Sequence, residues 1–339
     1  MKKLRIGING FGRIGRIASR IILQRDNLEL VALNSRADAS SHAYLLKYDT
    51  VYGTLPYDIK ALSDNLTIDS KKVNVFREDL PEQIPWKDVN VDIIIEASGK
   101  FRTKEDASGH LKSGGKYVVV SAPAKDDMKT LVMGINHHSF DPKLDKVISN
   151  SSCTTNALST TLKVLHEEFG VKNGFMTTIH AVTDSQNLLD NSHKKETRLR
   201  RSAMGNMIPA STGSAKDIGK LYPELAGKII CKAIRVPLLT VSMVDLTVEV
   251  KKTVDSSAVN KAFGKYSQGS LKGILGVAAE ELVSRDFIGS TYAAVVDPYL
   301  TSVLDGNLVK VYSWYDNEWG YTSRLIDMVE YVARKSHLL

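Results

Sequence analysis

Cys153 is the side chain with the clearest potential for covalent chemistry. It lies in residues 149–156, where an extended run gives way to a helical pattern, next to Ser152, Thr154 and Asn156. Free backbone N–H groups in the first turn of a helix favour an anion, and the thiolate is the form of cysteine that attacks carbon. A lone cysteine is more often a small buried apolar residue. The polar neighbours argue against an apolar pocket here, so the position predicts a nucleophile.

His180 is the best candidate among the eight histidines for the base that such a thiol needs. It ends a β-branched run just before a polar loop. An isolated histidine is more often structural. Beside Cys153, however, an imidazolium stabilises the thiolate and an imidazole carries its proton.

Two further segments are suited to phosphate. Ser211, Thr212 and Gly213 precede a helical pattern at residues 214–221, and they offer hydroxyls and free N–H groups. Arg235 is a lone charge in an otherwise apolar strand pattern, and a charge there needs an anionic partner. The sequence leaves open whether that partner is a bound anion or an internal salt bridge.

A strand–helix–strand pattern at the N-terminus predicts the first domain, with elements at residues 4–9, 13–25 and 28–34. Gly10, Gly12 and Gly15 lie in its first connection with the spacing G-x-G-x-x-G, which permits a tight turn and a close approach of a pyrophosphate to backbone N–H groups. Beside such a domain, a nucleophilic cysteine suggests oxidation of an aldehyde. The route is a thiohemiacetal that gives a hydride to nicotinamide and leaves a thioester.

The end of the second strand bears on which dinucleotide is bound. An acidic residue there usually accepts hydrogen bonds from the adenine ribose and repels a 2′-phosphate. This chain has Ser35 followed by Arg36, which removes the repulsion and offers a phosphate partner, so the sequence favours NADP. The alternative is that Arg36 is a solvated loop residue and that Asp38 fills the acidic role.

The remaining pattern predicts two domains of α/β class. Further strands at residues 73–76, 91–96, 117–121 and 131–133, with a helix near 104–111, indicate a mostly parallel Rossmann sheet. After Cys153, longer β-branched runs indicate an α+β domain with a larger, mostly antiparallel sheet, at residues 175–182, 228–236, 240–250 and 308–315, with a helix near 256–266. We expect a dinucleotide-binding domain at residues 1–152, completed by a C-terminal helix within 318–339, and a catalytic domain at 153–317.

The composition is that of a globular protein, with 339 residues, 43% hydrophobic and 24% charged. Two cysteines and the absence of a signal or long apolar segment predict a cytoplasmic protein without a membrane partner. The net charge of +7 suits anionic small ligands, and no motif supports nucleic-acid binding. No metal site is predicted.

Taken together, the residues closely resemble the phosphorylating glyceraldehyde-3-phosphate dehydrogenase family of glycolysis and photosynthetic carbon fixation. The resemblance runs from end to end, and its most specific pieces are residues 9–16, 149–156, 211–213 and 314–321. It implies Cys153 as nucleophile and His180 as base and general acid. It further implies that phosphate groups are held by Ser152, Thr154, Thr183, Thr212, Gly213 and Arg235. For the cofactor it implies Arg13 and Ile14 at the pyrophosphate, Ser98 and Ser121 in the pocket, and Asn317 at the nicotinamide carboxamide.

The resemblance also implies a homotetramer, in which the loop 183–206 reaches the cofactor of a neighbouring subunit. NAD-specific members carry aspartate at the position of Ser35 and a leucine-proline pair at the position of Asn191 and Ser192. Serine at position 192 resembles the NADP-using photosynthetic enzymes, so two separate changes favour NADP over NAD. The basic cluster of Lys194, Lys195, Arg198, Arg200 and Arg201 is expected to contact a 2′-phosphate, a partner subunit or only solvent.

Two rival functions remain open at this point. Erythrose-4-phosphate dehydrogenase is a sister group that departs from the patterns at Thr183 and residues 211–213, both of which this chain retains. A non-catalytic protein that uses the dinucleotide fold for nucleotide or RNA contacts has only the positive charge in its favour. Retention of the catalytic positions predicts the phosphorylated triose as substrate and inorganic phosphate as the second reactant.

Overall fold

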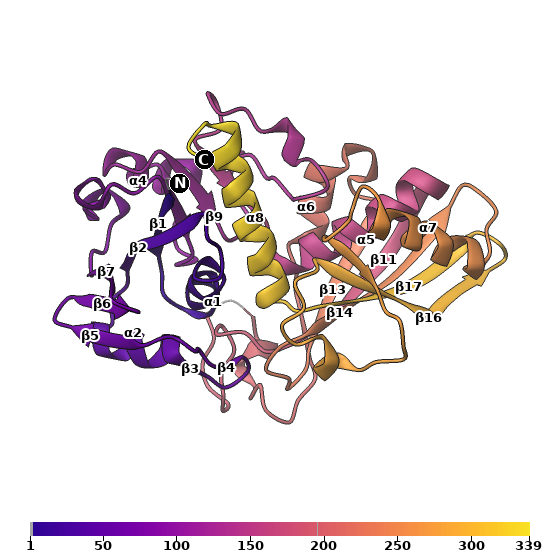
Figure 1. Cartoon of the computed structure of the whole chain (residues 1–339). Helices are drawn as coiled ribbons and strands as arrows, with labels where there is room; N and C mark the ends of the chain where they lie inside the picture. Colours follow the sequence, from indigo (N-terminus) through magenta and orange to yellow (C-terminus); the bar gives the residue numbers. More distant parts are fainter. Residues whose placement is uncertain (1–2, 195) are drawn as a thin grey trace. The chain divides into compact units, whose positions relative to one another are not determined.

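The computed structural model describes residues 3–194 and 196–339 and divides them into two compact units (Figure 1). The first unit consists of the chain up to Ser151 together with Thr322–Leu339, and the second of Ser152–Tyr321. Each unit has its own sheet, and the long C-terminal helix α8 (Trp319–Lys335) contributes most of its length to the first unit.

The first unit is built on a sheet that, in the described residues, has eight strands. In order across the sheet they are β10 (Val147–Ser149), β9 (Tyr117–Val120), β8 (Ile93–Glu96), β1 (Leu4–Asn9), β2 (Leu28–Asn34), β7 (Lys71–Phe76), β6 (Asn65–Ile68) and β5 (Ile59–Leu62). Neighbouring strands from β10 to β7 are parallel, whereas β6 and β5 form an antiparallel edge. The expected mostly parallel sheet is therefore confirmed. The buried β-branched run of β8 fits its place in the middle of the sheet.

Two of the helices in the described part of this unit begin at a side-chain cap. The helices of this part are α1 (Arg13–Ile22), α2 (Ala39–Lys47), α3 (Lys104–Ala107), α4 (Gly109–Lys112) and α8. The Asp38 carboxylate accepts from the Ser41 N–H and starts α2, and Thr103 starts α3 in the same way. Helix α1 starts at the predicted residue but ends three residues before Arg25, at a cap formed by Leu23.

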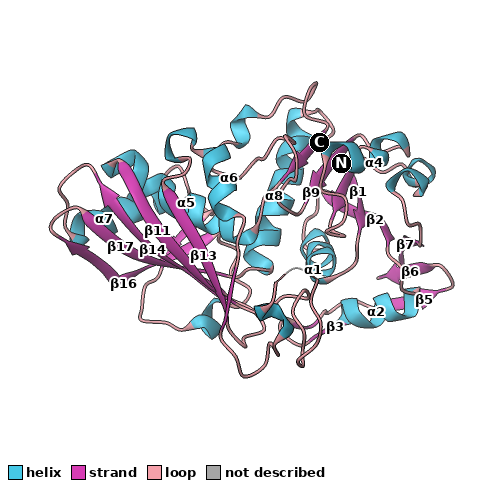
Figure 2. Cartoon of the chain, turned by 180° about the vertical axis from the view of Figure 1, so that it is seen from behind, coloured by secondary structure: helices cyan, strands magenta, loops and turns pink. Residues whose placement is uncertain are grey.

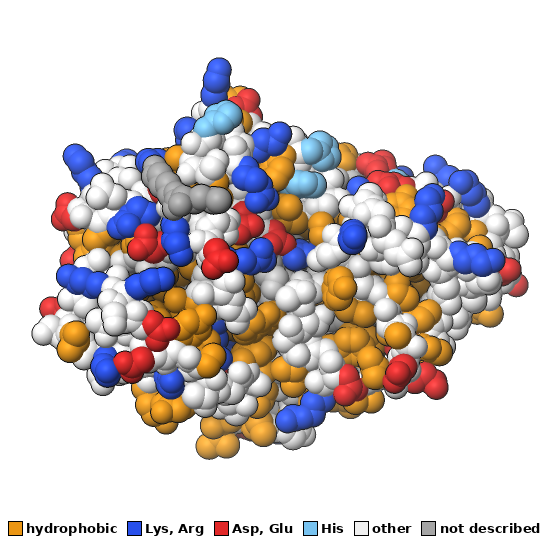
Figure 3. Space-filling model, viewed as in Figure 1, with side chains coloured by type: hydrophobic (Ala, Val, Ile, Leu, Met, Phe, Trp, Pro, Cys, Tyr) orange, Lys and Arg blue, Asp and Glu red, His pale blue; other side chains and the backbone are white. Residues whose placement is uncertain are grey.

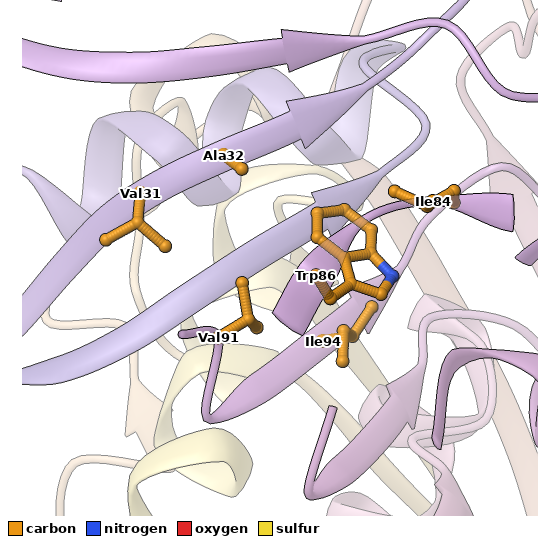
Figure 4. Close-up of a cluster of buried hydrophobic side chains, with 6 residues drawn as sticks. All are labelled: Val31, Ala32, Ile84, Trp86, Val91 and Ile94. Atoms are coloured by element: carbon orange, nitrogen blue, oxygen red, sulfur yellow. The ribbon is translucent and has the colours of Figure 1, made fainter. Parts of the chain in front are cut away.

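A buried cluster supports one face of the parallel sheet near β1, β2 and β8 (Figure 4). Trp86 is fully buried in it, and Gly7 of β1 makes room for the indole, because a Cβ at position 7 would lie 2.8 Å from the ring. The members of the cluster are Val31, Ala32, Ile84, Trp86, Val91 and Ile94. This packing holds the strands whose carboxyl ends carry the glycine motif.

The second unit is built on a sheet of seven strands within its described residues. In order across the sheet the strands are β12 (Ile208–Ala210), β13 (Ile229–Arg235), β11 (Val171–His180), β14 (Ser242–Val250), β17 (Leu308–Tyr315), β16 (Ala294–Leu304) and β15 (Leu275–Val277). Only β11 with β13 and β15 with β16 pair in parallel, so the expected mostly antiparallel sheet is confirmed. With seven strands against eight, it is not the larger sheet.

Helices cover the buried face of this second sheet. Figure 2 shows α5 (Cys153–Phe169) and α7 (Ser256–Gln268) lying along one side of the strands, and α6 (Ser214–Leu221) packs against α5. Strand β14 alternates buried and partly exposed side chains along its whole length, as expected for a sheet with one covered face. The start of α5 and the end of β11 thereby come together.

Short elements complete the described chain. Strands β3 (Tyr48–Asp49) and β4 (Gly53–Thr54) form a small hairpin, and single 3₁₀ turns occur at Pro81–Gln83, Trp86–Val89, His137–Ser139, Arg198–Arg200, Pro223–Leu225 and Ser284–Phe287. The strand predicted at residues 131–133 is wrong: Thr130 makes one bridge to Ser149, and the chain then turns at Gly134 with φ of 78°. Leu131 and Val132 are apolar because they are buried, not because they are extended in a sheet. Within the described residues, no helix combines the length and apolar character needed to cross a membrane.

Candidate active site

Cys153 is the first residue of α5, as the sequence predicted for its local structure. Ser152 caps the helix, because its hydroxyl accepts a hydrogen bond from the Thr155 N–H at 3.1 Å. The Cys153 Sγ lies 3.5 Å from Nε2 of His180, the last residue of β11. The helix start and the strand end therefore bring thiol and imidazole into contact.

The other nitrogen of His180 has two competing neighbours. Nδ1 lies 2.7 Å from the Ala181 carbonyl oxygen and 2.5 Å from Nη1 of Arg235, which is the register partner of His180 on β13. A protonated Nδ1 donates to the carbonyl and leaves the Nε2 lone pair facing Cys153, whereas an Nδ1 that accepts from Arg235 puts the proton on Nε2. Only the first arrangement lets Nε2 take the thiol proton. An anion that binds Arg235 favours this first arrangement, because it draws the guanidinium away from Nδ1.

Burial controls the charges of this pair. Burial raises the pKa of the Cys153 thiol, and the Arg235 guanidinium opposes that effect. Burial and Arg235 together lower the pKa of His180 to about 3. A lone charge on either group is disfavoured, so the two groups change charge together when a proton passes from Sγ to Nε2. The N–H groups at the start of α5 stabilise the sulfur side of that transfer.

Tyr315 links the two catalytic elements, a role that sequence reasoning missed. Its buried hydroxyl lies 2.9 Å from Oγ1 of Thr154 on α5 and 2.7 Å from Oγ1 of Thr178 on β11. Its ring also packs edge-on against the His180 ring, with 6.1 Å between centroids. The available signal was its place in the specific segment 314–321, which sequence analysis used only for Asn317.

A hydroxyl-rich turn at the start of α6 is joined to the start of α5. Thr155 Oγ1 lies 3.4 Å from Ser214 Oγ, and Ser214 Oγ lies 3.0 Å from Thr212 Oγ1. Gly213 is the cap residue of α6 and supplies no side chain, which leaves the helix N-terminus open. Ser211 donates to Glu196 through both its hydroxyl and its N–H, at 2.7 and 3.2 Å, and this fixes the turn.

Arg235 has no carboxylate within salt-bridge distance in residues 3–194 and 196–339, so an internal salt bridge does not account for it. Within the described residues, the Arg235 guanidinium contacts His180 and the Ala181 carbonyl oxygen. Thr183 lies two residues after Ala181 in the chain. It contacts Ser185 and Gln186 rather than Cys153 or Arg235. Hydrogen bonds thus link four of the anion-binding candidates to the surroundings of Cys153, some of them through intervening residues: Ser152, Thr154, Thr212 and Arg235.

Asn317 and Ser192 lie in very different surroundings. Asn317 is buried, and its amide oxygen accepts from Ser242, whose hydroxyl also accepts from the N–H of Ala181 beside His180. Ser192 is exposed in the loop that follows β11, with its N–H bonded to the Asn191 side chain at 2.7 Å. In the basic cluster of this loop, Lys195 lies outside the described residues, and Arg201 pairs with Asp190 on the surface.

The glycine motif of the first unit leaves space where a pyrophosphate would approach. Gly10 has φ of +93°, and a Cβ there would lie 2.4 Å from the Ser98 backbone nitrogen. A Cβ at Gly15 would lie 2.1 Å from the Gly10 carbonyl oxygen, so both glycines are required. Gly12 has open space around it and caps α1 without a side-chain hydrogen bond. The first N–H groups of α1, at Arg13 and Ile14, therefore face a site that fits a phosphate group.

A buried hydrogen-bond network ties together the strand ends around this turn. Glu96 accepts from the Asn9 amide at 2.5 Å, from the Ser98 N–H at 2.7 Å and from the Ser98 hydroxyl at 2.5 Å. His110 Nδ1 accepts from the Trp86 indole at 3.0 Å, so its Nε2 donates to Glu96 at 2.9 Å. The Ser121 N–H bonds to the Glu96 carbonyl oxygen at 2.9 Å. The ends of β1, β8 and β9 are thus held by satisfied buried partners.

The ribose end of the same sheet is exposed. Ser35 follows β2, and its N–H donates to the Phe76 carbonyl oxygen at the end of β7. Arg36 forms an ion pair with Asp79, which follows β7 and which sequence reasoning missed. Asp38 caps α2 through both of its oxygens, which accept from the N–H and the hydroxyl of Ser41.

Comparison with known proteins agrees with this arrangement. Residues 4–104 match the family model "Glyceraldehyde 3-phosphate dehydrogenase, NAD binding domain", and residues 152–317 match the "C-terminal domain" model of the same family. Glyceraldehyde-3-phosphate dehydrogenase 1 of Bacillus cereus is 48% identical over 98% of this chain and 99% of its own length. The dehydrogenases of Geobacillus stearothermophilus and Priestia megaterium are 47% and 46% identical, each over 98% of this chain and 99% of theirs. The chain belongs to the glyceraldehyde-3-phosphate dehydrogenase family.

Proposed function

We propose that Cys153 carries out the phosphorylating oxidation of glyceraldehyde 3-phosphate to 1,3-bisphosphoglycerate with NAD(P)⁺ as oxidant. The observation that carries this proposal is the 3.5 Å contact between Cys153 Sγ and His180 Nε2 at the start of α5. Family membership supports the reaction and disfavours both erythrose-4-phosphate oxidation and a non-catalytic role.

The residues of the second unit perform the chemistry in four stages. Sγ of Cys153 bonds to the aldehyde carbon while its proton passes to Nε2 of His180, and that proton then neutralises the carbonyl oxygen to give a thiohemiacetal. His180 next removes the hydroxyl proton as the carbon gives up a hydride, for which the bound cofactor supplies the acceptor. The product is a thioester. A phosphate oxygen then attacks the thioester carbon, and the Cys153 sulfur leaves.

Anion binding organises the substrate and the attacking phosphate. Ser152, Thr154, Thr212 and Gly213 supply hydroxyls and N–H groups for inorganic phosphate. Arg235, which has no carboxylate partner in the described residues, supplies the charge shared with the substrate phosphate. Thr183 is proposed to complete the substrate-phosphate site on closure around the ligand. Engagement of Arg235 by an anion also relieves its competition for His180 Nδ1, so phosphate binding improves the base.

The cofactor is proposed to bind at the glycine motif, with NADP preferred over NAD. Because Asp49 engages the Arg13 side chain, pyrophosphate contacts come from the N–H groups of Arg13 and Ile14. Ser98 and Ser121 line the pocket, and Asn317 in the second unit holds the carboxamide. The preference rests on the absence of an acidic side chain at Ser35, on the guanidinium of Arg36, and on Ser192.

Initial rates test both parts of this proposal. With glyceraldehyde 3-phosphate, kcat/KM is expected to be higher for NADP⁺ than for NAD⁺, and turnover is expected to stop after one equivalent when phosphate is omitted. A clear preference for NAD⁺ overturns the cofactor assignment. Faster oxidation of erythrose 4-phosphate, or steady release of a carboxylic acid without phosphate, overturns the substrate or the final step.

The quaternary structure is proposed to be a homotetramer. Large apolar side chains are exposed on α2 and β3, on the loop after β11 and on the outer face of the second sheet, at Tyr44, Leu45, Tyr48, Leu188, Leu189, Met207, Phe175 and Ile230. Such exposure is typical of a subunit interface. On the face shown in Figure 3, lysine and arginine side chains are interspersed with acidic ones. Light scattering is expected to give four times the chain mass.

Two free cysteines support a cytoplasmic location.

A further inference from the structure

The segment after β7 carries an acidic residue, Asp79, at the edge of the sheet where β2 ends without one. In dinucleotide-binding folds, the acidic residue that receives the ribose 2′-hydroxyl normally ends the second strand, where this chain has Ser35. Strands β2 and β7 are adjacent and parallel, with Asn34 opposite Phe76. The residues that follow β7 therefore lie at the same edge of the sheet as Ser35 and Arg36.

Asn34 fixes that segment through the Glu78 backbone. The Asn34 amide nitrogen donates to the Glu78 carbonyl oxygen at 2.9 Å, and the Glu78 N–H donates to the Asn34 amide oxygen at 2.9 Å. Asn34 is only 4% exposed, and its amide nitrogen also donates to Asn9. The backbone on which Asp79 stands is thus anchored to the buried network, although the Asp79 side chain itself is exposed.

The Asp79 carboxylate uses one oxygen to hold Arg36. Nε and Nη2 of Arg36 both donate to Oδ1, at 3.0 and 2.8 Å, and the two side chains are 72% and 67% exposed. In the part of the chain that the structure describes, Oδ2 of Asp79 and Nη1 of Arg36 have no hydrogen-bond partner. The ion pair therefore leaves an acceptor, Asp79 Oδ2, and a donor, Arg36 Nη1, available to a ligand.

We propose that Asp79 is a specificity-determining residue that sets the balance between NADP and NAD. When the ribose carries a 2′-hydroxyl, Oδ2 accepts its hydrogen bond in place of the missing residue at the end of β2. When the ribose carries a 2′-phosphate, Asp79 repels it and competes with it for Arg36. The inference rests on the proposed cofactor site. It implies that the chain uses both cofactors, and that the Asp79 carboxylate limits the preference for NADP over NAD.

Binding of ligands that lack nicotinamide tests the role of Asp79 apart from catalysis. We would titrate ADP-ribose and 2′-phospho-ADP-ribose into the intact protein by calorimetry, and measure kcat/KM with NAD⁺ and NADP⁺ alongside. In Asp79→Asn, the dissociation constant of the 2′-phosphorylated ligand is expected to fall about 3- to 10-fold, and that of the unphosphorylated ligand to rise by a similar factor. The gain for the phosphorylated ligand should shrink at high salt.

Asp58→Asn is the matched control, because Asp58 forms an equally exposed ion pair with Lys60 on β5 and the substitution changes the net charge identically. It should leave both ligands unaffected. Arg36→Gln tests the site itself and should weaken only the phosphorylated ligand. An unchanged ligand ratio in Asp79→Asn, with Arg36→Gln effective, overturns the role of Asp79 and leaves the proposed site standing. If Arg36→Gln also leaves the ratio unchanged, both the site and the role of Asp79 are wrong.

Discussion

The catalytic centre of the second unit and the ribose end of the first differ in how their polar groups are held. Around Cys153, the side chains of His180, Thr154 and Tyr315 are buried and joined by contacts within the protein. At the ribose end, Arg36 is held by one exposed ion pair. Buried partners fix one geometry because leaving any of them unpaired is costly, whereas an exposed pair contributes little and can exchange partners. The proposed chemistry thus lies in the part whose geometry is fixed, and the proposed cofactor choice in the part whose partners can exchange.

Removal of the proposed base in the buried centre should have the largest effect on activity. His180→Asn is expected to lower kcat about 10²- to 10⁴-fold, because no group then takes the thiol and hydroxyl protons. The pH at which iodoacetamide alkylates Cys153 should also rise, since the imidazolium no longer stabilises the thiolate. A superimposable alkylation profile would show that His180 does not act on the thiol.

A smaller effect is expected from Tyr315→Phe, which removes the hydroxyl shared by Thr154 and Thr178. The free energy of unfolding should fall by about 1–3 kcal/mol, and kcat should fall about tenfold because the Cys153 helix start loses a tie to the His180 strand. Tyr222→Phe is the control, since the Tyr222 hydroxyl donates to the Ser159 carbonyl oxygen away from the thiol. It should lower stability, measured by urea unfolding, without changing kcat. Equal kcat values in the two variants would reduce Tyr315 to a packing residue.

The smallest effect concerns His42, a buried group close to the adaptable end of the first unit. Its ring packs on Phe11, and within the described residues neither ring nitrogen has a partner at good hydrogen-bond geometry, so that burial lowers the pKa of His42 more than the Ala37 backbone raises it. Burial, aided by Arg16, lowers the pKa of His42, an effect that Asp38 opposes and Arg77 reinforces. The unfolded chain therefore takes up a proton below about pH 6.5 that the folded chain does not, and stability is lost as the pH falls.

His42→Leu should raise Tm by about 2–5 °C at pH 7, and by more at pH 5. His42→Gln keeps a buried polar group but does not titrate, so it should remove the pH dependence without the gain at pH 7. Thermal unfolding of the three proteins at both pH values separates these contributions. A Leu variant less stable than the parent at both values would mean that the imidazole is satisfied.

Sequence reasoning succeeded where local pattern and chemistry coincide. The start of α5 at Cys153, the end of β11 at His180 and the glycine turn follow from caps, periodicity and spacing within short segments. It failed where a residue acts through distant neighbours. Asp79 lies 43 positions from Arg36, and only the pairing of β2 with β7 brings them together.

Two other differences have identifiable physical causes. Asp38 was considered from the sequence only as an acidic ribose partner, but a carboxylate three residues before Ser41 is also suited to cap a helix, and in the structure it caps α2. Leu131 and Val132 suggested a strand because they are apolar, although burial beside a turn produces the same residue types. Periodicity over three residues cannot separate these cases.

The central claim is that a thioester forms on Cys153 and that only phosphate releases it. Mass spectrometry of the intact protein, after mixing with glyceraldehyde 3-phosphate and oxidised cofactor without phosphate, tests it directly. The account predicts one acyl adduct per chain, located on Cys153 by peptide mapping, absent in Cys153→Ser, and discharged when inorganic phosphate is added. Turnover without an adduct, or an adduct on another residue that phosphate discharges, would contradict it.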